Sequence, residues 1–256
     1  MHPLSDSFRN ARLGVVGAGR VGGALASALR EAGVPVDGPA ARGEVPTRCD
    51  ALVLCVPDAE IRAAAAAVAG AAPLVGHTSG ATGLDALAPA GGAAFGMHPL
   101  QTFAEGAAGP SAFGGAGCAV AGTTPEALAF ATALAQTLGM VPFEIDEEGR
   151  AAYHAAASVA SNFIVTLQAA AESIATGAGL EPAQARALLV PLLRRTVDNL
   201  AALGPERALT GPVARGDEPT VLAQRRAVAE AAPHLLDLFD ELVHHTRVLA
   251  SQEVGA

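Results

Sequence analysis

The sequence predicts an α/β domain with a mostly parallel sheet, followed by an all-helical domain. In the first part of the chain, short apolar runs such as residues 12–16, 51–56 and 73–76 alternate with segments of helical spacing. Strands that alternate with helices need crossover connections, which make neighbouring strands parallel. After Ile145 the strand-like runs end and long Ala-rich segments follow. We therefore expect a first domain over residues 1–147 and a second over residues 148–256.

The elements of the first domain follow from its apolar runs and breaks. A helix after residues 12–16 has apolar residues at helical spacing and stops at Gly33. Residues 51–56 form a continuous apolar run, as expected of a strand buried on both faces. The predicted strands are residues 12–16, 34–37, 51–56, 73–76, 93–97, 118–121 and 141–145, with further helices at 61–68 and 125–138.

The second domain is predicted to be helical throughout. Asp146 and the two following acids favour a helix start. One long helix over about residues 151–175 is closed by Gly177 and Gly179. Pro182 opens the next helix, which Pro191 is expected to kink. Two more helices fit residues 219–231 and 233–251.

Composition limits the classes of function. Hydrophobic residues make up 51% of the 256-residue chain and charged residues 16%, which is typical of a well-packed globular protein. No run reaches the roughly 18 apolar residues of a membrane span, and the N-terminus lacks a secretory signal, so we expect a soluble cytoplasmic protein without a membrane partner. A net charge of −9 argues against a nucleic-acid partner. The three cysteines form no C-x-x-C pair, and we predict no metal site.

The 16 lysine and arginine residues counted together are all arginine, so the chain contains no lysine. A Schiff-base lysine, a Walker lysine and a lysine general acid are therefore excluded. Proton transfer is left to His, Asp, Glu, Cys, the single Tyr153, the substrate or water.

A glycine motif follows the first predicted strand and opens the first predicted helix. This context is the one in which G-x-G-x-x-G binds a dinucleotide. The first glycine permits a tight turn, the second lets the backbone approach a pyrophosphate, and the third packs the helix on the strand. The sequence therefore predicts a Rossmann domain whose pyrophosphate site comprises Gly17, Ala18, Gly19, Arg20, Val21 and Gly22.

The second predicted strand bears on the choice of cofactor. An NAD site usually has an acid about 20 residues into the motif, where Asp37 lies. If the strand continues to Ala40 or Ala41, Asp37 faces elsewhere and Arg42 meets a 2′-phosphate. We favour NADP, with NAD as the second choice.

Several longer motifs resemble a known family. LGVVGAGRVGGALASAL, DALVLCVPD, GHTSGATGLDAL, FGMHPLQTF, YHAAASVASNF and LTGPVARGD are together similar to Rossmann-like proteins with a C-terminal domain of unknown function 2520. The resemblance implies an NADP-dependent oxidoreductase. Prephenate dehydrogenases, pyrroline-carboxylate reductases and β-hydroxyacid dehydrogenases are more distantly similar. They imply a helical domain that forms a homodimer and a substrate between the two domains.

The resemblance also implies positions along the cofactor. It places Val56, Pro57 and Asp58 beside the cofactor and His77 near its nicotinamide end, and His98 with Pro99 is similar to the His-Pro of prephenate dehydrogenases. β-Hydroxyacid dehydrogenases have a catalytic lysine four residues before an asparagine. Here Asn162 matches that asparagine, but Ser158 stands at the lysine position, so the proton donor of that family is missing.

Two histidines follow predicted strands. His77 and His98 are expected at the carboxyl edge of the sheet, where ligands bind in open α/β folds. A hydrogen-bonded structural role is an equally good interpretation of each histidine taken alone.

A polar stripe marks the first predicted helix of the second domain. His154, Ser158 and Asn162 are spaced i, i+4 and i+8 and share one helix face, with Tyr153 beside them. The stripe indicates either a cleft lining or a hydrogen-bonded helix contact. Our hypothesis is that His98 or His154 exchanges a proton, Asn162 and Ser79 orient the substrate, and Tyr153 and Ser158 contact it.

The loop over residues 210–217 contains Arg215, whose planar fork suits a substrate carboxylate. A tight interhelical turn with an Arg–Asp pair is an equally good interpretation. Together these features predict an NAD(P)-dependent oxidoreductase acting on a small carbonyl, hydroxyl or imine compound. The alternative is a non-catalytic NADP-binding sensor or regulatory protein, since a fold does not by itself decide chemistry.

Overall fold

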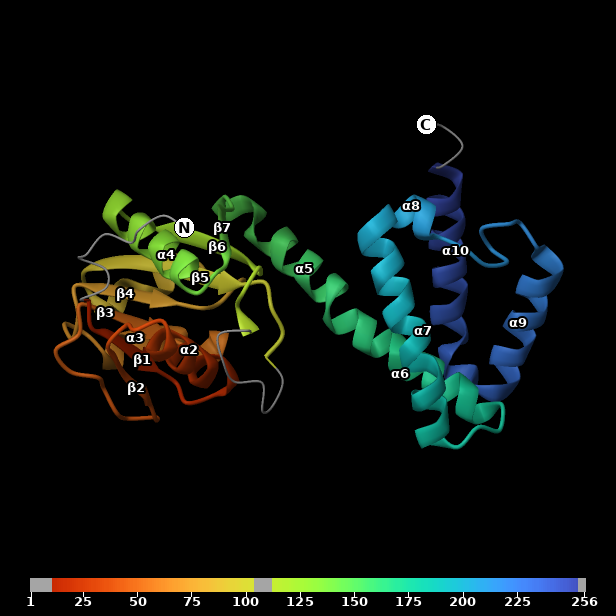
Figure 1. Cartoon of the computed structure of the whole chain (residues 1–256), viewed down its shortest axis with the longest axis horizontal. Helices are drawn as coiled ribbons and strands as arrows, with labels where there is room; N and C mark the ends of the chain where they lie inside the picture. Colours follow the sequence, from red (N-terminus) through yellow and green to blue (C-terminus); the bar gives the residue numbers. More distant parts are fainter. Residues whose placement is uncertain (1–10, 104–111, 253–256) are drawn as a thin grey trace. The chain divides into compact units, whose positions relative to one another are not determined.

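The computed structural model describes residues 11–103 and 112–252 (Figure 1). The chain divides into two compact units, Met1–Ser158 and Val159–Ala256. The first unit contains the sheet and its covering helices, and the second is helical. The predicted fold class, a mostly parallel α/β domain followed by an all-helical one, is confirmed.

The sheet has seven strands in the order β2-β1-β3-β4-β5-β6-β7. Among the described residues, the β5–β6 pair is antiparallel and the other neighbouring pairs are parallel. Each predicted strand is present, but the second begins two residues later than expected and runs on to Ala40. The bounds are β1 Leu13–Val16, β2 Val36–Ala40, β3 Ala51–Leu54, β4 Leu74–His77, β5 Ala93–Pro99, β6 Gly117–Gly122 and β7 Val141–Glu144.

Helices cover both faces of the sheet. α2 (Arg20–Glu31) and α4 (Pro125–Thr137) bury Leu25 and Leu134 against one face. On the other face, Ile61 of α3 (Ile61–Ala67) and Leu87 of the 3₁₀ helix η2 (Leu84–Ala90) are buried. Successive residues of β3 alternate between these two cores, which explains why its run is continuously apolar.

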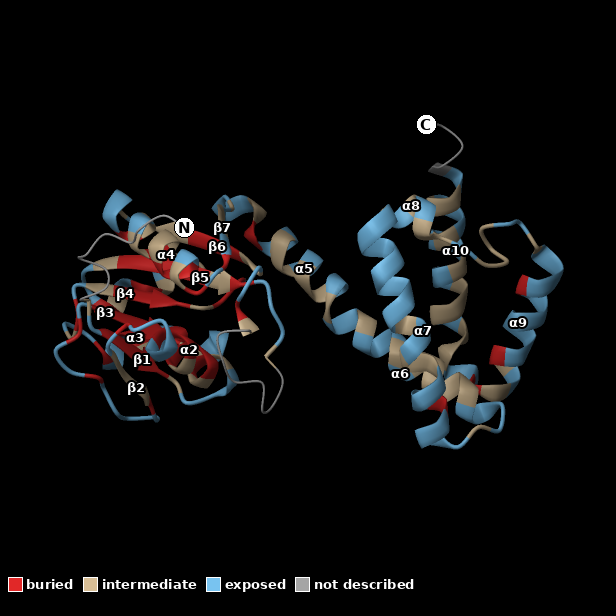
Figure 2. Ribbon diagram, viewed as in Figure 1, coloured by how far each residue is buried: buried red, intermediate tan, exposed pale blue. Residues whose placement is uncertain are grey.

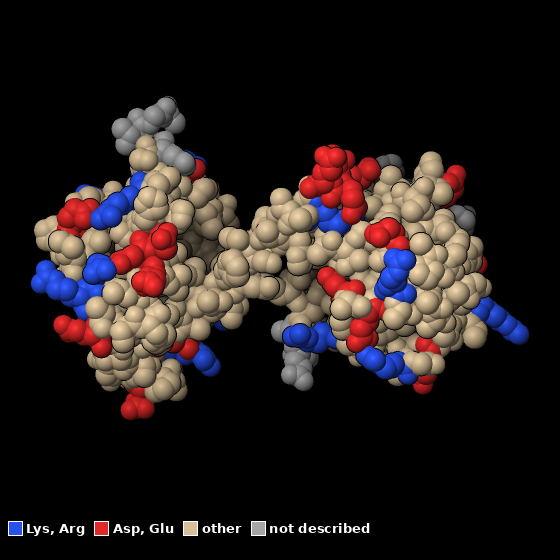
Figure 3. All heavy atoms as spheres, turned by 180° about the vertical axis from the view of Figure 1, so that it is seen from behind, with Lys and Arg blue, Asp and Glu red and all other residues tan. Residues whose placement is uncertain are grey.

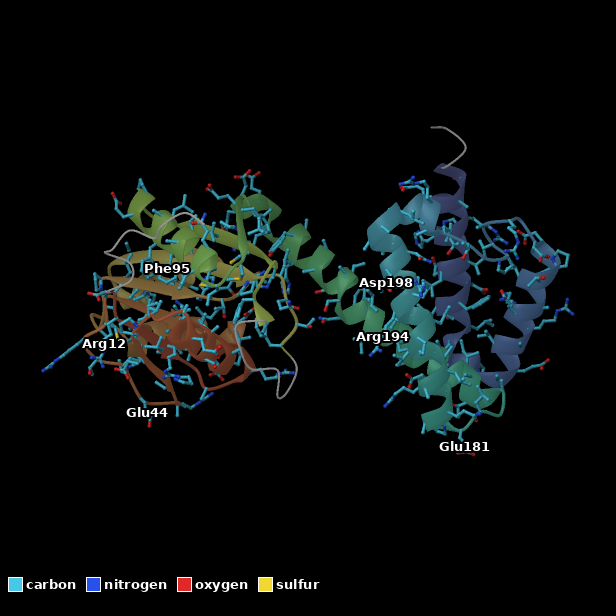
Figure 4. All side chains as sticks on the ribbon, viewed as in Figure 1. Arg12, Glu44, Phe95, Glu181, Arg194 and Asp198 are labelled. Atoms are coloured by element: carbon cyan, nitrogen blue, oxygen red, sulfur yellow. The ribbon has the colours of Figure 1, made fainter. Side chains whose placement is uncertain are left out.

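The sheet is the most deeply buried part of the first unit (Figure 2). Phe95 of β5, labelled in Figure 4, is fully buried, and its ring packs edge-on against Phe130 of α4 with centroids 5.1 Å apart. This packing holds β5 in the middle of the core, so that its carboxyl end is positioned by rigid neighbours.

The long helix predicted over residues 151–175 is wrong as one element. The 3₁₀ helix η4 (Glu147–Gly149) leads into α5 (Arg150–Ala160), and α6 (Asn162–Gly177) follows as a separate helix. Ser161 between them has φ −123° and ψ −72°, outside the helical region. Ser and Asn side chains compete with helical hydrogen bonds, and the sequence places both at this point. For the same reason, Asn162 does not continue the predicted polar face, which His154 and Ser158 still share on α5.

The second unit has little core of its own. Its other helices are α7 (Pro182–Leu203), α8 (Pro205–Ala208), α9 (Glu218–Ala231), η5 (Pro233–Leu235) and α10 (Leu236–Gln252). Among its described residues, only Ala185, Val221, Val228 and Ala232 are buried hydrophobics. α7 continues through Pro191, and α6 packs against α7.

The surface in Figure 3 carries arginines interspersed among acidic side chains, without a continuous basic area on that face. This distribution accords with the net charge of −9. In the part of the chain that the structure describes, no helix combines the length and apolarity needed to cross a bilayer.

Candidate functional site

The turn between β1 and α2 is built around close backbone packing. Gly17 has φ +106°, a conformation that favours glycine, and a Cβ on it would collide with the carbonyl oxygen of Cys55. A Cβ on Gly22 would in turn collide with the carbonyl oxygen of Gly17. A Cβ on Gly19 would meet no atom within 4 Å. Packing therefore requires glycine at positions 17 and 22, whereas Gly19 has open space beside its backbone.

The N-terminus of α2 lacks a side-chain acceptor. Gly19 is the N-cap residue and makes no side-chain cap, and the first turn contains no acid. The first N–H groups of a helix have no intrahelical partner, and the helix dipole makes this end positive. Such an end binds phosphate groups well. Arg20 and Val21 begin this helix, with Arg20 exposed and Val21 half-buried.

A cavity of about 610 Å³ opens beside the turn. Its volume lies within the usual range of small-molecule and cofactor sites. Val56 and Pro57 line it, and the small side chains of α3 form an apolar wall. The walls include Gly17, Ala18, Gly19, Val45, Ala63, Ala64 and Ala67.

Arg42 stands at this cavity with its side chain 84% exposed. Its Nη2 atom donates to both carboxylate oxygens of Glu60, at 2.6 and 2.7 Å. Asp37 is engaged elsewhere, because its carboxylate accepts from Arg12 and from the backbone N–H of Thr47. β2 does run on to Ala40, the condition under which Arg42 rather than Asp37 was expected to face the cofactor. An exposed ion pair is weak, so Arg42 can exchange Glu60 for another anion.

His77 is the last residue of β4 and is fully buried. Its Nδ1 atom accepts from the Ser79 N–H at 3.2 Å, and its Nε2 atom faces the Gly83 carbonyl oxygen at 3.4 Å. Burial lowers the pKa of His77, which favours the neutral ring. His77 therefore ties the loop after β4 to the sheet, and it lies outside the walls of the 610 Å³ cavity.

Ser79 shapes the same loop. Its hydroxyl oxygen accepts from the N–H groups of Ala81 and Thr82, at 3.2 and 2.9 Å. The loop then passes closely over β5, since a Cβ on Gly80 would lie 2.7 Å from the His98 ring. Gly80, in the loop that Ser79 shapes, thus packs directly against the His98 ring.

His98, Tyr153 and His154 come together at the end of β5 and on α5. The Nδ1 atom of His98 lies 2.7 Å from the Tyr153 hydroxyl. The His98 and His154 rings have centroids 5.9 Å apart. Burial, followed by the nearby His154, lowers the pKa of His98 to about 4, against the opposing charge of Asp58. Burial raises the pKa of Tyr153 to about 12. The pair therefore joins a neutral imidazole to a neutral phenol at neutral pH.

Arg150, which the sequence analysis missed, lies beside this pair. It is the first residue of α5 and is buried, and it lines a small hollow together with Ser79, Gly96 and Tyr153. An arginine in the first turn of a helix faces an unfavourable dipole. That conflict, two residues after Glu148, is the signal in the sequence that could have singled it out.

The remaining predicted residues are dispersed. Asp58 begins the 3₁₀ helix η1 (Asp58–Glu60), and its charge acts on both His77 and His98. Ser158 is half-buried on α5. Asn162 begins α6 and Arg215 is exposed before α9, so both belong to the second compact unit. Asp217, beside Arg215, caps α9 by accepting from the N–H of Thr220. Within residues 11–103 and 112–252, no three His, Cys, Asp or Glu side chains converge as a metal site.

A glycine turn after the first strand of a parallel sheet, opening onto a cavity, defines this protein as a member of the Rossmann-fold class. The chain belongs to the family described as domain of unknown function DUF2520, whose sequence profile matches residues 116–246. The resemblance noted in the motifs is thereby confirmed. No functionally curated protein matches the chain.

Solved structures share the fold over nearly the whole chain. A candidate NADP oxidoreductase of Bacteroides fragilis has a TM-score of 0.79 at 22% identity, covering 94% of this chain and 99% of that one. A Thermotoga maritima protein has a TM-score of 0.74 at 26% identity, with the same coverages. The pyrroline carboxylate reductase of Plasmodium falciparum, solved with NADP bound, has a TM-score of 0.59 at 13% identity and covers 95% and 99%.

The lowered pKa of His98 predicts a loss of stability in acid. The unfolded chain binds a proton at His98 near its ordinary pKa of 6.5, whereas the folded protein binds it only near 4. The free energy of unfolding should therefore fall as the pH decreases between these two values. Urea unfolding across this range should show a shallower fall for His98→Gln than for the natural protein. Exposed His234 offers the control, because His234→Gln should keep the natural slope; equal slopes for all three proteins would contradict the assignment.

Proposed function

We propose that this protein is an NADP-dependent oxidoreductase acting on a small carbonyl, hydroxyl or imine compound. The observation that carries the proposal is the uncapped glycine turn, which opens onto a cavity of about 610 Å³ with Arg42 at its edge. The candidate oxidoreductase of Bacteroides fragilis and the NADP-bound reductase of Plasmodium falciparum support it through the shared fold.

The residues of the turn fit a dinucleotide. The free N–H groups at the start of α2, near Gly19, would bind the pyrophosphate, and the guanidinium of Arg42 would bind a 2′-phosphate. Val56 and Pro57 would lie along the cofactor, with Asp58 next in the chain. His77 stays a prediction at the nicotinamide end, acting through the loop that it holds. When bound, NADP supplies or accepts the hydride.

The proton needs a partner of this chain. If the Tyr153 hydroxyl donates to Nδ1 of His98, then Nε2 of His98 carries the ring's proton. This proton can pass to a substrate oxygen or nitrogen while Nδ1 takes up a proton from Tyr153 or from water, so that the ring stays neutral. His154 packs edge-on against His98 and is the second candidate. Ser79 contributes by shaping the loop over His98, while Ser158, Asn162 and Arg215 stay predictions as substrate contacts.

A non-catalytic NADP-binding sensor is the second candidate function. The lack of any lysine favours it, because a common proton donor of related dehydrogenases is missing. This candidate predicts tight binding of NADP without turnover of any carbonyl, hydroxyl or imine compound.

We assign cofactor binding to residues 1–147 and dimerisation, with part of the substrate site, to residues 148–256. The second unit buries few of its apolar residues, whereas Leu188 and Leu192 of α7 are 59% and 63% exposed and lie on one helix face. Val165 of the neighbouring α6 is 71% exposed. Helices with such faces need a partner, and we propose that a second copy of this chain covers them.

The cofactor assignment predicts a selective effect of Arg42. NADP should raise the melting temperature of the natural protein more than NAD does, since preferential binding stabilises the folded state. Arg42→Gln should weaken NADP about tenfold through loss of a charge-assisted contact, and leave NAD unaffected. Glu60→Gln should strengthen NADP, because it frees Arg42. Arg62→Gln on α3 is the matched control and should change neither; a larger shift with NAD than with NADP would overturn the choice of cofactor.

The catalytic assignment predicts a loss of turnover without a loss of cofactor. His98→Ala should lower kcat by about a hundredfold or more, the range of general acid–base catalysis. Tyr153→Phe, which removes only the hydroxyl, should lower it less. NADPH oxidation with a panel of carbonyl and imine compounds gives kcat, and calorimetry gives NADP affinity. His234→Gln serves as the control; an unchanged kcat in His98→Ala would exclude His98 as the proton partner.

The dimer assignment predicts a change in mass. The natural chain should elute as a dimer in size-exclusion chromatography with light scattering. Leu188→Glu combined with Leu192→Glu should yield monomers, because two buried carboxylates would face the partner. Val141→Glu, at an equally exposed valine of β7, should leave the dimer intact. A monomeric natural protein would refute the assignment.

A further inference from the structure

Arg150 is a buried cation whose partner does not explain its position. Its side chain is 10% exposed, and its Nε atom donates to Glu147 at 3.1 Å. The Glu147 side chain, three residues earlier, is 67% exposed. An i,i+3 ion pair forms at the surface without burying the guanidinium, so the pair alone gives no reason for the burial.

The location of Arg150 is also electrostatically unfavourable without an anion. It begins α5, where the helix dipole is positive and repels a cation. A guanidinium has five N–H donors, and of these only the Nε donor has a hydrogen-bond partner among the described residues. No fully buried side-chain nitrogen of those residues lacks a partner, so the Nη1 and Nη2 donors are open to solvent and to a ligand. Buried charges are usually paired or hydrogen-bonded. An additional anion would accept hydrogen bonds from the remaining donors. It would also offset the charge of the guanidinium and the positive end of the helix dipole.

The surroundings provide a place for such an anion. Arg150 lines a hollow of about 10 Å³ with Ser79, Gly96 and Tyr153. That volume fits one water-sized group, such as one oxygen of a carboxylate. The His98–Tyr153 hydrogen bond lies at the same place, since Tyr153 belongs to both. The positive charge of Arg150 also acts on His77, His98 and Tyr153.

We propose that Arg150 binds the carboxylate of a small acidic substrate and holds that substrate beside His98 and Tyr153. The inference rests on the proposed function, whose substrate class it names. It also moves to Arg150 the carboxylate contact that was one of two equally good interpretations of Arg215. Arg215 lies exposed in a loop, whereas Arg150 is buried beside titratable groups, where a charge-assisted contact is stronger.

The chain carries its own probe for this site. Tyr153 is the single tyrosine and there is no tryptophan, so intrinsic fluorescence reports on Tyr153 alone. Propanoate should change this emission with saturation at constant ionic strength, whereas the uncharged isostere propanamide should not. Propanoate binding should weaken by about tenfold or more in Arg150→Gln. Arg62→Gln removes the same charge from an exposed position and should keep the natural affinity.

Two further measurements keep the test decisive. Arg150→Lys retains the charge but loses the planar fork, so its affinity should lie between those of the natural protein and Arg150→Gln. Circular dichroism shows whether Arg150→Gln folds. If it does not, the Lys variant and the comparison of propanoate with propanamide test whether Arg150 binds a carboxylate. Equal binding of the acid and the amide, unchanged propanoate affinity in the folded Gln or Lys variant, or tighter binding of inorganic phosphate than of propanoate would overturn the proposal.

Failure of this inference is distinguishable from failure of the proposed function. The propanoate titration needs no cofactor, and the NADP thermal shift needs no substrate. Absence of an NADP thermal shift in the natural protein would refute the proposed oxidoreductase function, but it would leave the Arg150-dependent carboxylate site standing. An NADP thermal shift without any propanoate binding would refute only the proposal that the substrate is acidic.

Discussion

The close approach of three backbone segments at the end of β1 is the constraint on which the site depends. Gly17 packs against the carbonyl of Cys55, and Gly22 packs against the carbonyl of Gly17. No side chain fits at either contact, so β1, β3 and α2 meet directly. This contact aims the start of α2 at the open cavity, and it sets the loop after β3 beside that cavity. The proposed cofactor site therefore presents backbone at the glycine turn and small apolar side chains on α3.

The part of the site around His98 consists instead of buried side chains that are uncharged at neutral pH. His77 and His98 are held neutral by burial, and Tyr153 remains protonated. The His77–Ser79 hydrogen bond holds the loop after β4, and the His98–Tyr153 hydrogen bond joins the end of β5 to the start of α5. A neutral network of this kind tolerates a low local dielectric. Arg150 is the exception, a permanent charge that lies beside these groups.

Local patterns were sufficient for most of the fold, but partners across the chain were not predictable from them. The glycine turn and the buried strand over residues 51–54 follow from periodicity and breaks, whereas the strand predicted over residues 34–37 lies later, at Val36–Ala40. The break at Ser161 did not, because one Ser-Asn pair is a weak signal within a long Ala-rich helix. The hydrogen bond between His98 and Tyr153 joins residues 55 positions apart, and only the packing of α5 on the sheet edge creates it.

Charge coupling links the two roles proposed around α5. The positive charge of Arg150, after burial and His154, contributes to the low pKa of His98. A carboxylate bound to Arg150 would neutralise that charge, and the pKa of His98 would then rise towards its ordinary value. By linkage, protonating His98 would strengthen the binding of the acid in the same measure. On the proposed roles, an acidic substrate at Arg150 would favour the protonated form of His98, while burial, the largest cause of the low pKa, would continue to oppose it. Substrate choice and proton exchange would then be coupled through one buried arginine.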